Sequence, residues 1–258
     1  MNKLNFIIPA RMESSRLPGK VLEKIGDKSM LDWVYRNCAQ SAHASDVIVG
    51  TDSAEIEQHC HERGFKVTMT GAHNCCSNRS AEVADSLDSE WIVEVQSDEP
   101  FLWASIVDQW LDRALAAVRL NENVDVVLSR ARIPSNVAHM SKFVKMVISP
   151  TGAPMWASRS RIPSDYKIPV PVIWGHMGLY LWRRKSLIKF ASIEPGPIEK
   201  SEDTHALRIW ESGMQPLAIE IEKTQGVDVP EDLEMARLYA VENKVEIAKR
   251  FTISGDSQ

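Results

Sequence analysis

The stretch Phe6-Ile-Ile-Pro-Ala-Arg-Met-Glu-Ser-Ser-Arg-Leu-Pro-Gly-Lys20 decides the fold, because an apolar run leads directly into a cationic loop. Residues 4–8 predict a buried strand, which Pro9 ends. A cationic loop after the first strand of an α/β domain is where nucleotide phosphates bind, although it could equally be a solvated basic segment. The spacing matches neither GxxxxGKS/T nor GxGxxG, so it predicts a different kind of phosphate loop. Its cationic and hydroxyl-bearing positions are Arg11, Ser14, Ser15, Arg16 and Lys20.

The residues that follow alternate between strand and helix patterns. We expect helices at 30–39, 54–63, 81–87 and 105–120, and strands at 47–51, 65–69 and 91–95. Asp52 or Ser53 is predicted to cap the second helix, and Gly64 to end it. This alternation predicts an α/β fold with a largely parallel sheet and helices on both faces. Arg11, Asp52 and Asp98 each follow a strand, so we expect them at the ligand-binding carboxyl edge.

The pattern changes from about residue 124. Strands are predicted at 124–128, 144–148 and 178–182, and helices at 183–191, 198–211 and 230–249. The stretch 162–174 holds several prolines and little helical periodicity, which favours an extended excursion. We therefore expect a single domain over 1–251 with an inserted arm at about 150–182, and a flexible tail at 252–258.

Composition narrows the class of protein. The 258 residues are 44% apolar and 25% charged, which is ordinary for a soluble globular protein. The formal net charge of −5 argues against a nucleic-acid polymer as partner, so an anionic substrate would need local cations. We see no membrane-spanning run and no signal peptide. The four cysteines have neither zinc spacing nor the density of a disulfide scaffold, which favours a reduced, cytoplasmic protein; a catalytic cysteine stays open.

Two aspartates stand out in separate motifs. Asp98 lies in Gln-Ser-Asp-Glu-Pro at 96–100, directly after a predicted strand, and Asp228 lies in Gly-Val-Asp-Val-Pro-Glu-Asp at 226–232. Two carboxylates at one sheet edge could share Mg²⁺, which prefers oxygen ligands and substrate phosphates. Asp228 alone could instead belong to a helix start, where acidic groups favour the positive end of the helix dipole.

Four other conspicuous side chains also have ordinary structural explanations. His176 precedes a strand and could be a packed, hydrogen-bonded histidine. Arg79 could be a surface cation on a helix. Glu199 and Glu202 are three residues apart and share a helix face, which is commonly just solvated. Residue type and spacing leave these alternatives open.

Several motifs occur in an order that points to one family. They are Pro-Ala-Arg-x-x-Ser-x-Arg-Leu-Pro-Gly-Lys at 9–20, Val-Gly-Thr-Asp at 49–52, Gln-x-Asp-Glu-Pro at 96–100, His-Met-Gly-Leu-Tyr at 176–180 and Gly-Val-Asp-x-Pro-Glu-Asp-Leu at 226–233. Over roughly residues 4–240 the chain resembles the CMP-sugar synthetases, the cytidylyltransferases that activate acidic sugars. Within them it is most similar to the 3-deoxy-manno-octulosonate (Kdo) cytidylyltransferases.

The resemblance implies a fold, a reaction and a partner. The fold is a Rossmann-like nucleotidyltransferase fold with a mostly parallel mixed sheet flanked by helices, and an extended arm that joins a homodimer. The reaction is CTP-dependent activation of Kdo or a Kdo-like acid sugar, giving a CMP-sugar and pyrophosphate for surface polysaccharide or lipopolysaccharide synthesis. The cofactor is Mg²⁺, and neither a nucleic-acid polymer nor a membrane is a partner.

The resemblance also implies roles for individual residues. Mg²⁺ would bind Asp98 and Asp228, and the catalytic residues would be Arg11, Lys20 and Asp98. The nucleotide would contact Ala10, Arg11, Arg16, Lys20, Ser77 and Arg79. The acceptor would contact Gln96, His176, Tyr180, Glu199, Glu202 and His205.

The chain departs from the family pattern at three places. Ser-Gly-Thr-Glu-Arg becomes Cys-Cys-Ser-Asn-Arg at 75–79, Gln-Gly-Asp becomes Gln-Ser-Asp at 96–98, and a Glu-Gln pair becomes His205-Ala206. The last change concerns the identity of the sugar, and the first two concern the preference for cytosine. Two alternatives therefore stay open: a different anionic acceptor (amino-Kdo, a nonulosonate or a phosphonate), or a non-catalytic nucleotide-binding relative.

Overall fold

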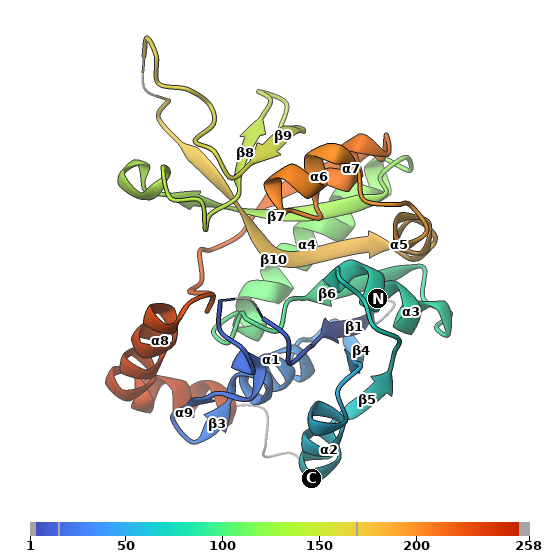
Figure 1. The fold of residues 1–258 in the computed structure, drawn as a ribbon, viewed down its shortest axis with the longest axis vertical. Coiled ribbons are helices and arrows are strands. Elements are labelled where there is room, and N and C mark those ends of the chain that lie inside the picture. The colour runs from blue at the N-terminus through green and yellow to red at the C-terminus, as the bar shows by residue number, and fades with distance from the viewer. Residues whose placement is uncertain (1–3, 15, 169, 253–258) are drawn as a thin grey trace.

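The computed structural model describes residues 4–14, 16–168 and 170–252 and has an α/β fold (Figure 1). Its strands are β1 (Leu4–Pro9), β2 (Lys24–Ile25), β3 (Lys28–Ser29), β4 (Ala44–Thr51), β5 (Lys66–Met69), β6 (Trp91–Val95), β7 (Val126–Ile133), β8 (Lys145–Ile148), β9 (Pro154–Ser158), β10 (Ile173–Arg183) and β11 (Pro216–Glu220). Its helices are α1 (Met30–Ala39), α2 (Ala54–Arg63), α3 (Cys76–Asp85), α4 (Ala104–Leu120), α5 (Arg184–Ala191), α6 (Pro197–Glu202), α7 (Leu207–Glu211), α8 (Pro230–Glu242) and α9 (Lys244–Thr252), with 3₁₀ turns η1 (Lys20–Leu22) and η2 (Ser135–Val137).

The central sheet has the strand order β11-β7-β10-β6-β1-β4-β5. β1 is parallel to β4 and β6, β4 to β5, and β11 to β7. β10 runs antiparallel between β6 and β7. The predicted fold class, a mostly parallel mixed sheet flanked by helices, is confirmed.

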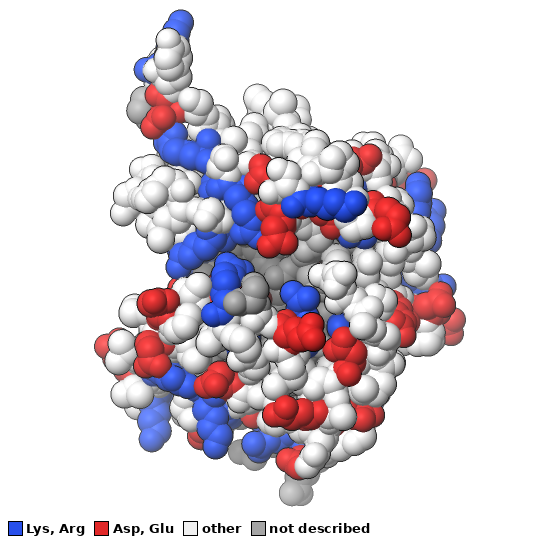
Figure 2. Space-filling view, viewed as in Figure 1, with Lys and Arg blue, Asp and Glu red and all other residues white. Residues whose placement is uncertain are grey.

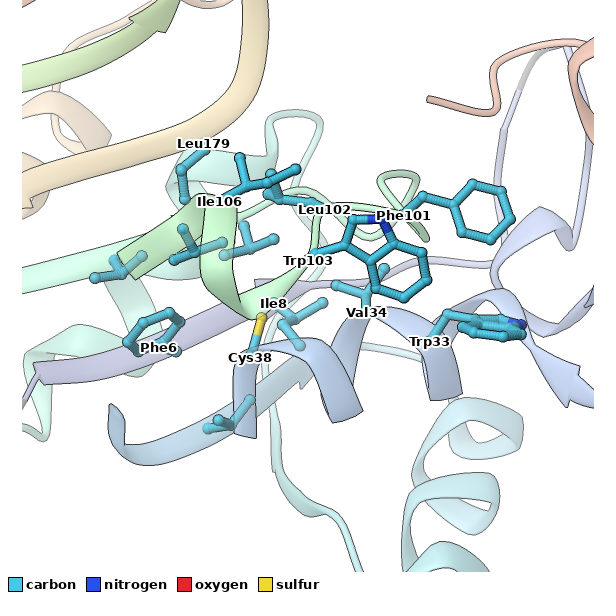
Figure 3. Close-up of a cluster of buried hydrophobic side chains, with 14 of the residues drawn as sticks. Phe6, Ile8, Trp33, Val34, Cys38, Phe101, Leu102, Trp103, Ile106 and Leu179 are labelled. Carbon is cyan, nitrogen blue, oxygen red and sulfur yellow. The ribbon is translucent and has the colours of Figure 1, made fainter. Parts of the chain in front are cut away.

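Alternating side chains of the strands build two cores, one on each face of the sheet. Phe6 and Ile8 of β1 point into the larger core, together with residues of α1, α4 and α8, whereas Ile7 points into the core under α3, α5 and α7. Figure 3 shows the larger core, where Phe6 and Ile8 lie beside Val34 and Cys38 of α1. Because successive residues of β1 face opposite cores, burial of both faces fixes the register of the strand.

Most of the predicted elements form where the sequence places them, and local geometry explains the exceptions. Ser53 caps α2 by accepting a hydrogen bond from Ile56 N, and Gly64 ends the helix with φ of 69°. The predicted helix 198–211 is two short helices, because Asp203 adopts the left-handed region with φ of 46°. Helix 230–249 likewise divides at Asn243. The sequence prediction did not include the strands β2, β3, β9 and β11.

The segment after β7 leaves the main sheet before returning as β10. β8 and β9 pair with each other, and β8 also pairs with β10. The chain between β9 and β10 projects away from the body of the molecule (Figure 1). This projection carries exposed apolar side chains: Tyr166 is 89% exposed and Ile168 79%. The predicted tail lies outside the described residues except for its first residue, which ends α9. Within the described ranges, no helix combines the length and the apolar character that a membrane span requires.

Candidate active site

The carboxyl edge of the sheet opens into a hollow. Figure 2 shows this hollow between the two halves of the molecule, with Lys and Arg side chains along much of its rim. The loop after β1 reaches the same edge, because Ala10 N donates to Gly50 O at the end of β4. Arg11 is exposed there, and within the described part of the chain its guanidinium forms no hydrogen bond or ion pair. A chain with net charge −5 therefore gathers cations at one edge.

Lys20 joins the two predicted metal-binding aspartates. Its ammonium lies 2.7 Å from Asp98 Oδ2 and 3.4 Å from Asp228 Oδ1, and it donates to Val227 O at 2.9 Å. Arg16 donates to the same Asp228 oxygen at 2.9 Å. The predicted pairing of Asp98 with Asp228 thus occurs in space, although 130 positions separate them in the sequence.

Local backbone geometry explains why these groups meet. Gly19 has φ of 70°, a conformation that glycine adopts without strain, and the turn delivers Lys20 at the start of η1. On the other side, Val227 N donates to Asp98 O at 2.9 Å, which holds the 226–228 segment against the end of β6. Asp232, rather than Asp228, accepts the hydrogen bonds of backbone N–H groups at the start of α8. Asp228 is therefore left to face the cations.

The charges around Lys20 suit a cation held between two carboxylates. Burial lowers the pKa of Lys20, but the Asp98 and Asp228 carboxylates outweigh it, so the pKa lies above its ordinary value. The ammonium already occupies the space between two carboxylate oxygens. Oxygen ligands converging on one positive group are the donor set that Mg²⁺ takes, so Asp98 and Asp228 fit a metal role.

Beside Asp98 and Asp228, Glu99 adds a third carboxyl group, which is buried. The sequence motifs did not single it out. It is 7% exposed and accepts a hydrogen bond from Thr224 Oγ1 at 2.9 Å. Burial, with a further contribution from the Asp98 charge, raises the pKa of Glu99 to about 7. Gly178 packs against this carboxyl: a Cβ there would lie 3.0 Å from both Gln96 Cβ and Glu99 Cγ. The lack of a side chain at Gly178 therefore lets β10 approach the 96–99 segment.

A second group of side chains lies at the other end of the site. Gln96 Nε2 is 3.5 Å from Tyr180 Oη and 3.7 Å from Cys76 Sγ. His205 Nε2 is 3.3 Å from Tyr180 Oη and 3.4 Å from Cys76 Sγ. His176 packs edge-on against Tyr180, with ring centroids 5.1 Å apart. The structure thus brings together four of the six residues predicted to contact the acceptor.

This second group is close to neutral. Burial, and then the neighbouring His205, lower the pKa of His176 to about 3, so its imidazole is uncharged at neutral pH. Burial raises the pKa of Tyr180 well above its ordinary value. Beneath them, Ser77 Oγ donates at 2.9 Å to the fully buried Glu94. The hydroxyl of Ser77, which was predicted to contact the nucleotide, is therefore already hydrogen-bonded to the internal carboxyl group of Glu94.

Three other predicted site residues hold the scaffold together. Arg79 is buried, lies 2.8 Å from Asp52 Oδ2 and donates to Thr70 Oγ1, so it links α3 to the ends of β4 and β5. Glu199 forms a buried, forked ion pair with Arg208, at 2.6 and 2.7 Å.

Glu202 accepts from Ser158 Oγ at 2.6 Å and from Arg159 N at 2.7 Å. It thereby ties α6 to the end of β9. Glu202, Arg79 and Glu199 thus all have internal partners, and for each the role of contacting a ligand stays a prediction.

The sequence does carry signals for the residues that were missed. Glu94 is a charged residue inside the apolar run Trp-Ile-Val-Glu-Val of β6, and such a residue needs a buried partner. The closeness of Cys76 and His205 has no comparable signal, because 129 positions separate them and the turn between α6 and α7 brings them together.

Comparison with known proteins finds similarity to nucleotidyltransferases. A family described as cytidylyltransferase matches residues 5–223. The 3-deoxy-manno-octulosonate cytidylyltransferase of Leptospira interrogans (serovar Lai, strain 56601) is 36% identical over 243 residues, covering 91% of this chain and 95% of that protein. A protein of the same name from Geobacter metallireducens is 35% identical over 246 residues, covering 90% and 95%. A structure of CMP:2-keto-3-deoxy-manno-octonic acid synthetase complexed with CTP has a TM-score of 0.85 and 30% identity, over 94% of this chain and all of that chain.

Proposed function

The chain belongs to the cytidylyltransferase family, and on that premise we propose that it transfers the cytidylyl group of CTP to Kdo. The products are CMP-Kdo and pyrophosphate, for use in lipopolysaccharide or other surface polysaccharide synthesis. One observation carries the proposal: Lys20, Asp98 and Asp228 converge within hydrogen-bonding distance at the carboxyl edge of the sheet. Transfer of a nucleotidyl group to an acidic acceptor needs two parts, a phosphate-binding loop and a pair of carboxylates.

The cationic residues would act on the triphosphate. Arg11 and Arg16 are exposed at the rim, where their guanidinium groups suit forked contacts with phosphate oxygens. Lys20 has three donors and a raised pKa, so it stays charged and can contribute a positive charge as pyrophosphate leaves. Gln96 and Tyr180, with the neutral His176, would orient the acceptor at the other end.

Asp98 and Asp228 would hold Mg²⁺. When bound there, Mg²⁺ supplies Lewis-acid chemistry toward the acceptor hydroxyl and the phosphate. The support is the donor set itself, two carboxylate oxygens that already converge on the Lys20 ammonium. The carboxylates would orient the reacting groups, and the arginine and lysine side chains would spread the developing charge.

The proposal is tested with Asp98→Asn. This substitution keeps the shape of the side chain and removes its charge, so pyrophosphate release from CTP and Kdo should fall by about 10²-fold or more. Asp46→Asn removes an exposed carboxylate that pairs with Lys66 outside the site, and it should behave like the unchanged protein. Undiminished turnover by Asp98→Asn, at every Mg²⁺ concentration, would remove Asp98 from the proposed machinery.

A different acidic acceptor is the second candidate. It is favoured by His205, which contacts Cys76 and Tyr180 where the family pattern has glutamate. Incubating the protein with CTP and a panel of Kdo, amino-Kdo, a nonulosonate and a phosphonate, and following pyrophosphate, separates the two candidates. Turnover with Kdo below that with another acceptor would favour the second candidate, and CTP binding without turnover on any acceptor would favour a non-catalytic protein.

We further propose a cytoplasmic homodimer joined through the arm at 150–182. The support is the exposed apolar surface of the arm, at Met155, Tyr166 and Ile168. Light scattering after size-exclusion chromatography should give twice the chain mass of 29.0 kDa. Tyr166→Glu with Ile168→Glu should give the monomer mass, and an unchanged mass would place the interface elsewhere.

A further inference from the structure

Three ligand-type side chains meet outside the aspartate site. Cys75 is the N-cap residue of α3, Cys76 is the first residue of that helix, and His205 lies in the turn between α6 and α7. We propose that these three residues bind a thiophilic divalent cation, and that Zn²⁺ is the ion that suits them best. Two thiolates and an imidazole form a common partial coordination shell for zinc, with the fourth position left to water or to a ligand.

The distances suit a tetrahedral ion. One ligand atom from each of the three residues can be chosen so that all lie within 4.8 Å of one another. Cys76 Sγ and His205 Nε2 are 3.4 Å apart. Zinc bonds of about 2.3 Å to sulfur and about 2.0–2.1 Å to nitrogen, at tetrahedral angles, separate the two ligand atoms by roughly 3.6 Å. The distance between Cys76 Sγ and His205 Nε2 therefore closely matches the distance expected for two ligands of one zinc ion. Cys75 Sγ would have to move slightly closer to complete the set.

The surroundings favour a positive charge at this point. Glu94 is fully buried next to the cluster, and one of its oxygens, Oε2, has no hydrogen-bond partner among the described residues. Its other oxygen, Oε1, accepts a hydrogen bond at 2.9 Å from Ser77, the residue that follows Cys76 in α3. A divalent cation held by the two thiolates would lie close to the Glu94 carboxyl group, whose Oε2 has no hydrogen-bond partner among the described residues.

The position gives the ion a structural consequence. Cys76 and His205 are both half-buried, so a ligand could reach the fourth coordination position of an ion held by them. Cys76 also contacts Gln96, and His205 contacts Tyr180. A bound ion would join the first turn of α3 to the α6–α7 turn and hold these side chains in place. The ion binds independently of whether Kdo is the acceptor.

The experiment uses the metal-free protein, kept reduced with a phosphine, and Co²⁺ as a spectroscopic substitute for Zn²⁺. One equivalent of Co²⁺ per chain should produce the thiolate-to-metal charge-transfer absorption of a tetrahedral site, and Zn²⁺ should displace it. Zn²⁺ should also raise Tm by several degrees, because a ligand of the native state stabilises it. Cys76→Ser and His205→Asn should each weaken Zn²⁺ binding at least 10-fold.

Two controls separate this site from other metal-binding groups. Cys60→Ser removes a buried thiol in α2, and Asp98→Asn removes a carboxylate of the other site, so both should keep the charge-transfer absorption. Circular dichroism checks that each variant is folded. No charge-transfer absorption in the unchanged protein, or an equal absorption in folded Cys76→Ser, would overturn the proposal.

Discussion

The two ends of the site are built in opposite ways. At the phosphate end, Arg16, Lys20 and two aspartates are charged and at least partly exposed, with side-chain exposures of 12% to 45%. At the proposed acceptor end, His176 and Tyr180 are buried, and burial shifts the pKa of each so that both side chains are uncharged at neutral pH. The buried ion pair between Glu199 of α6 and Arg208 of α7 joins the two helices on either side of His205. Under the proposed function the contrast would separate two tasks, since the triphosphate needs accessible positive charge and the acceptor needs groups that fix its orientation.

The largest expected effect concerns the buried pair at the acceptor end. Glu199→Gln should lower the free energy of unfolding by about 3–5 kcal/mol, because the guanidinium of Arg208 would stay buried without its counter-charge. Arg16→Gln breaks an exposed pair at the phosphate end and should cost about 0–1 kcal/mol. Urea denaturation measures both values.

A double variant shows whether the cost comes from the stranded charge. Glu199→Leu with Arg208→Met replaces both partners by apolar groups, and it should recover most of the stability that Glu199→Gln loses. If Glu199→Gln and Arg16→Gln lower the free energy of unfolding by the same amount, the ion pairs of the two ends do not differ in their contribution to stability.

The next effect concerns activity at the phosphate end. Lys20→Ala should lower kcat/KM for CTP by about 10²–10³-fold, because it removes a positioned charge from the site of transfer. Lys66→Ala is the matched control, since that lysine pairs with Asp46 on the surface of β4 and β5. A drop of less than about threefold in Lys20→Ala would mean that the arginines alone hold the triphosphate.

The meeting of Lys20 with Asp98 could be predicted from the sequence, because each lies in a contiguous motif that follows a strand. Gly19 and Lys20 follow β1, and Asp98 follows β6, so strand order alone brings them to one edge. For Asp228 the spacing left a helix-start role open, and the structure gives the helix-start hydrogen bonds to Asp232 instead. The metal role of Asp228 stays a prediction.

The acceptor end could not be assembled from the sequence for a topological reason. Cys76 begins α3 and His205 lies beyond β10, and their contact depends on the left-handed turn at Asp203. That turn also divides a segment whose periodicity predicts one continuous helix. A charged residue within an apolar strand, Glu94, was the available sign of a polar cluster beneath.

Glu99, which lies between the two ends, predicts a pH dependence of stability. Its pKa is raised by burial to about 7 from an ordinary value of 4.5, so the folded state binds its proton more tightly than the unfolded state. The stabilisation is complete below pH 4.5 and is lost as pH rises toward 7. At about 1.36 kcal/mol per pKa unit, the loss amounts to about 3 kcal/mol.

Glu99→Gln removes this titration while it keeps an oxygen for the Thr224 hydroxyl. The difference in unfolding free energy between the variant and the unchanged protein should shift in favour of Glu99→Gln by about 3 kcal/mol between pH 4.5 and 7.5. Urea titrations at intervals across this range measure it. A constant difference would mean that Glu99 has an ordinary pKa and belongs to the charged end.

The smallest expected effect tests whether the two ends act separately. His205→Ala removes the imidazole that contacts Tyr180 and Cys76, and one hydrogen bond of this kind contributes about 1 kcal/mol, or roughly fivefold in affinity. We expect KM for the acceptor to rise about fivefold while KM for CTP stays unchanged, in assays of pyrophosphate release. His61→Ala in α2 is the control. Because Gln96 contacts both Tyr180 and Cys76 and is followed two residues later by Asp98, a rise in KM for CTP would reveal coupling of the ends through that segment.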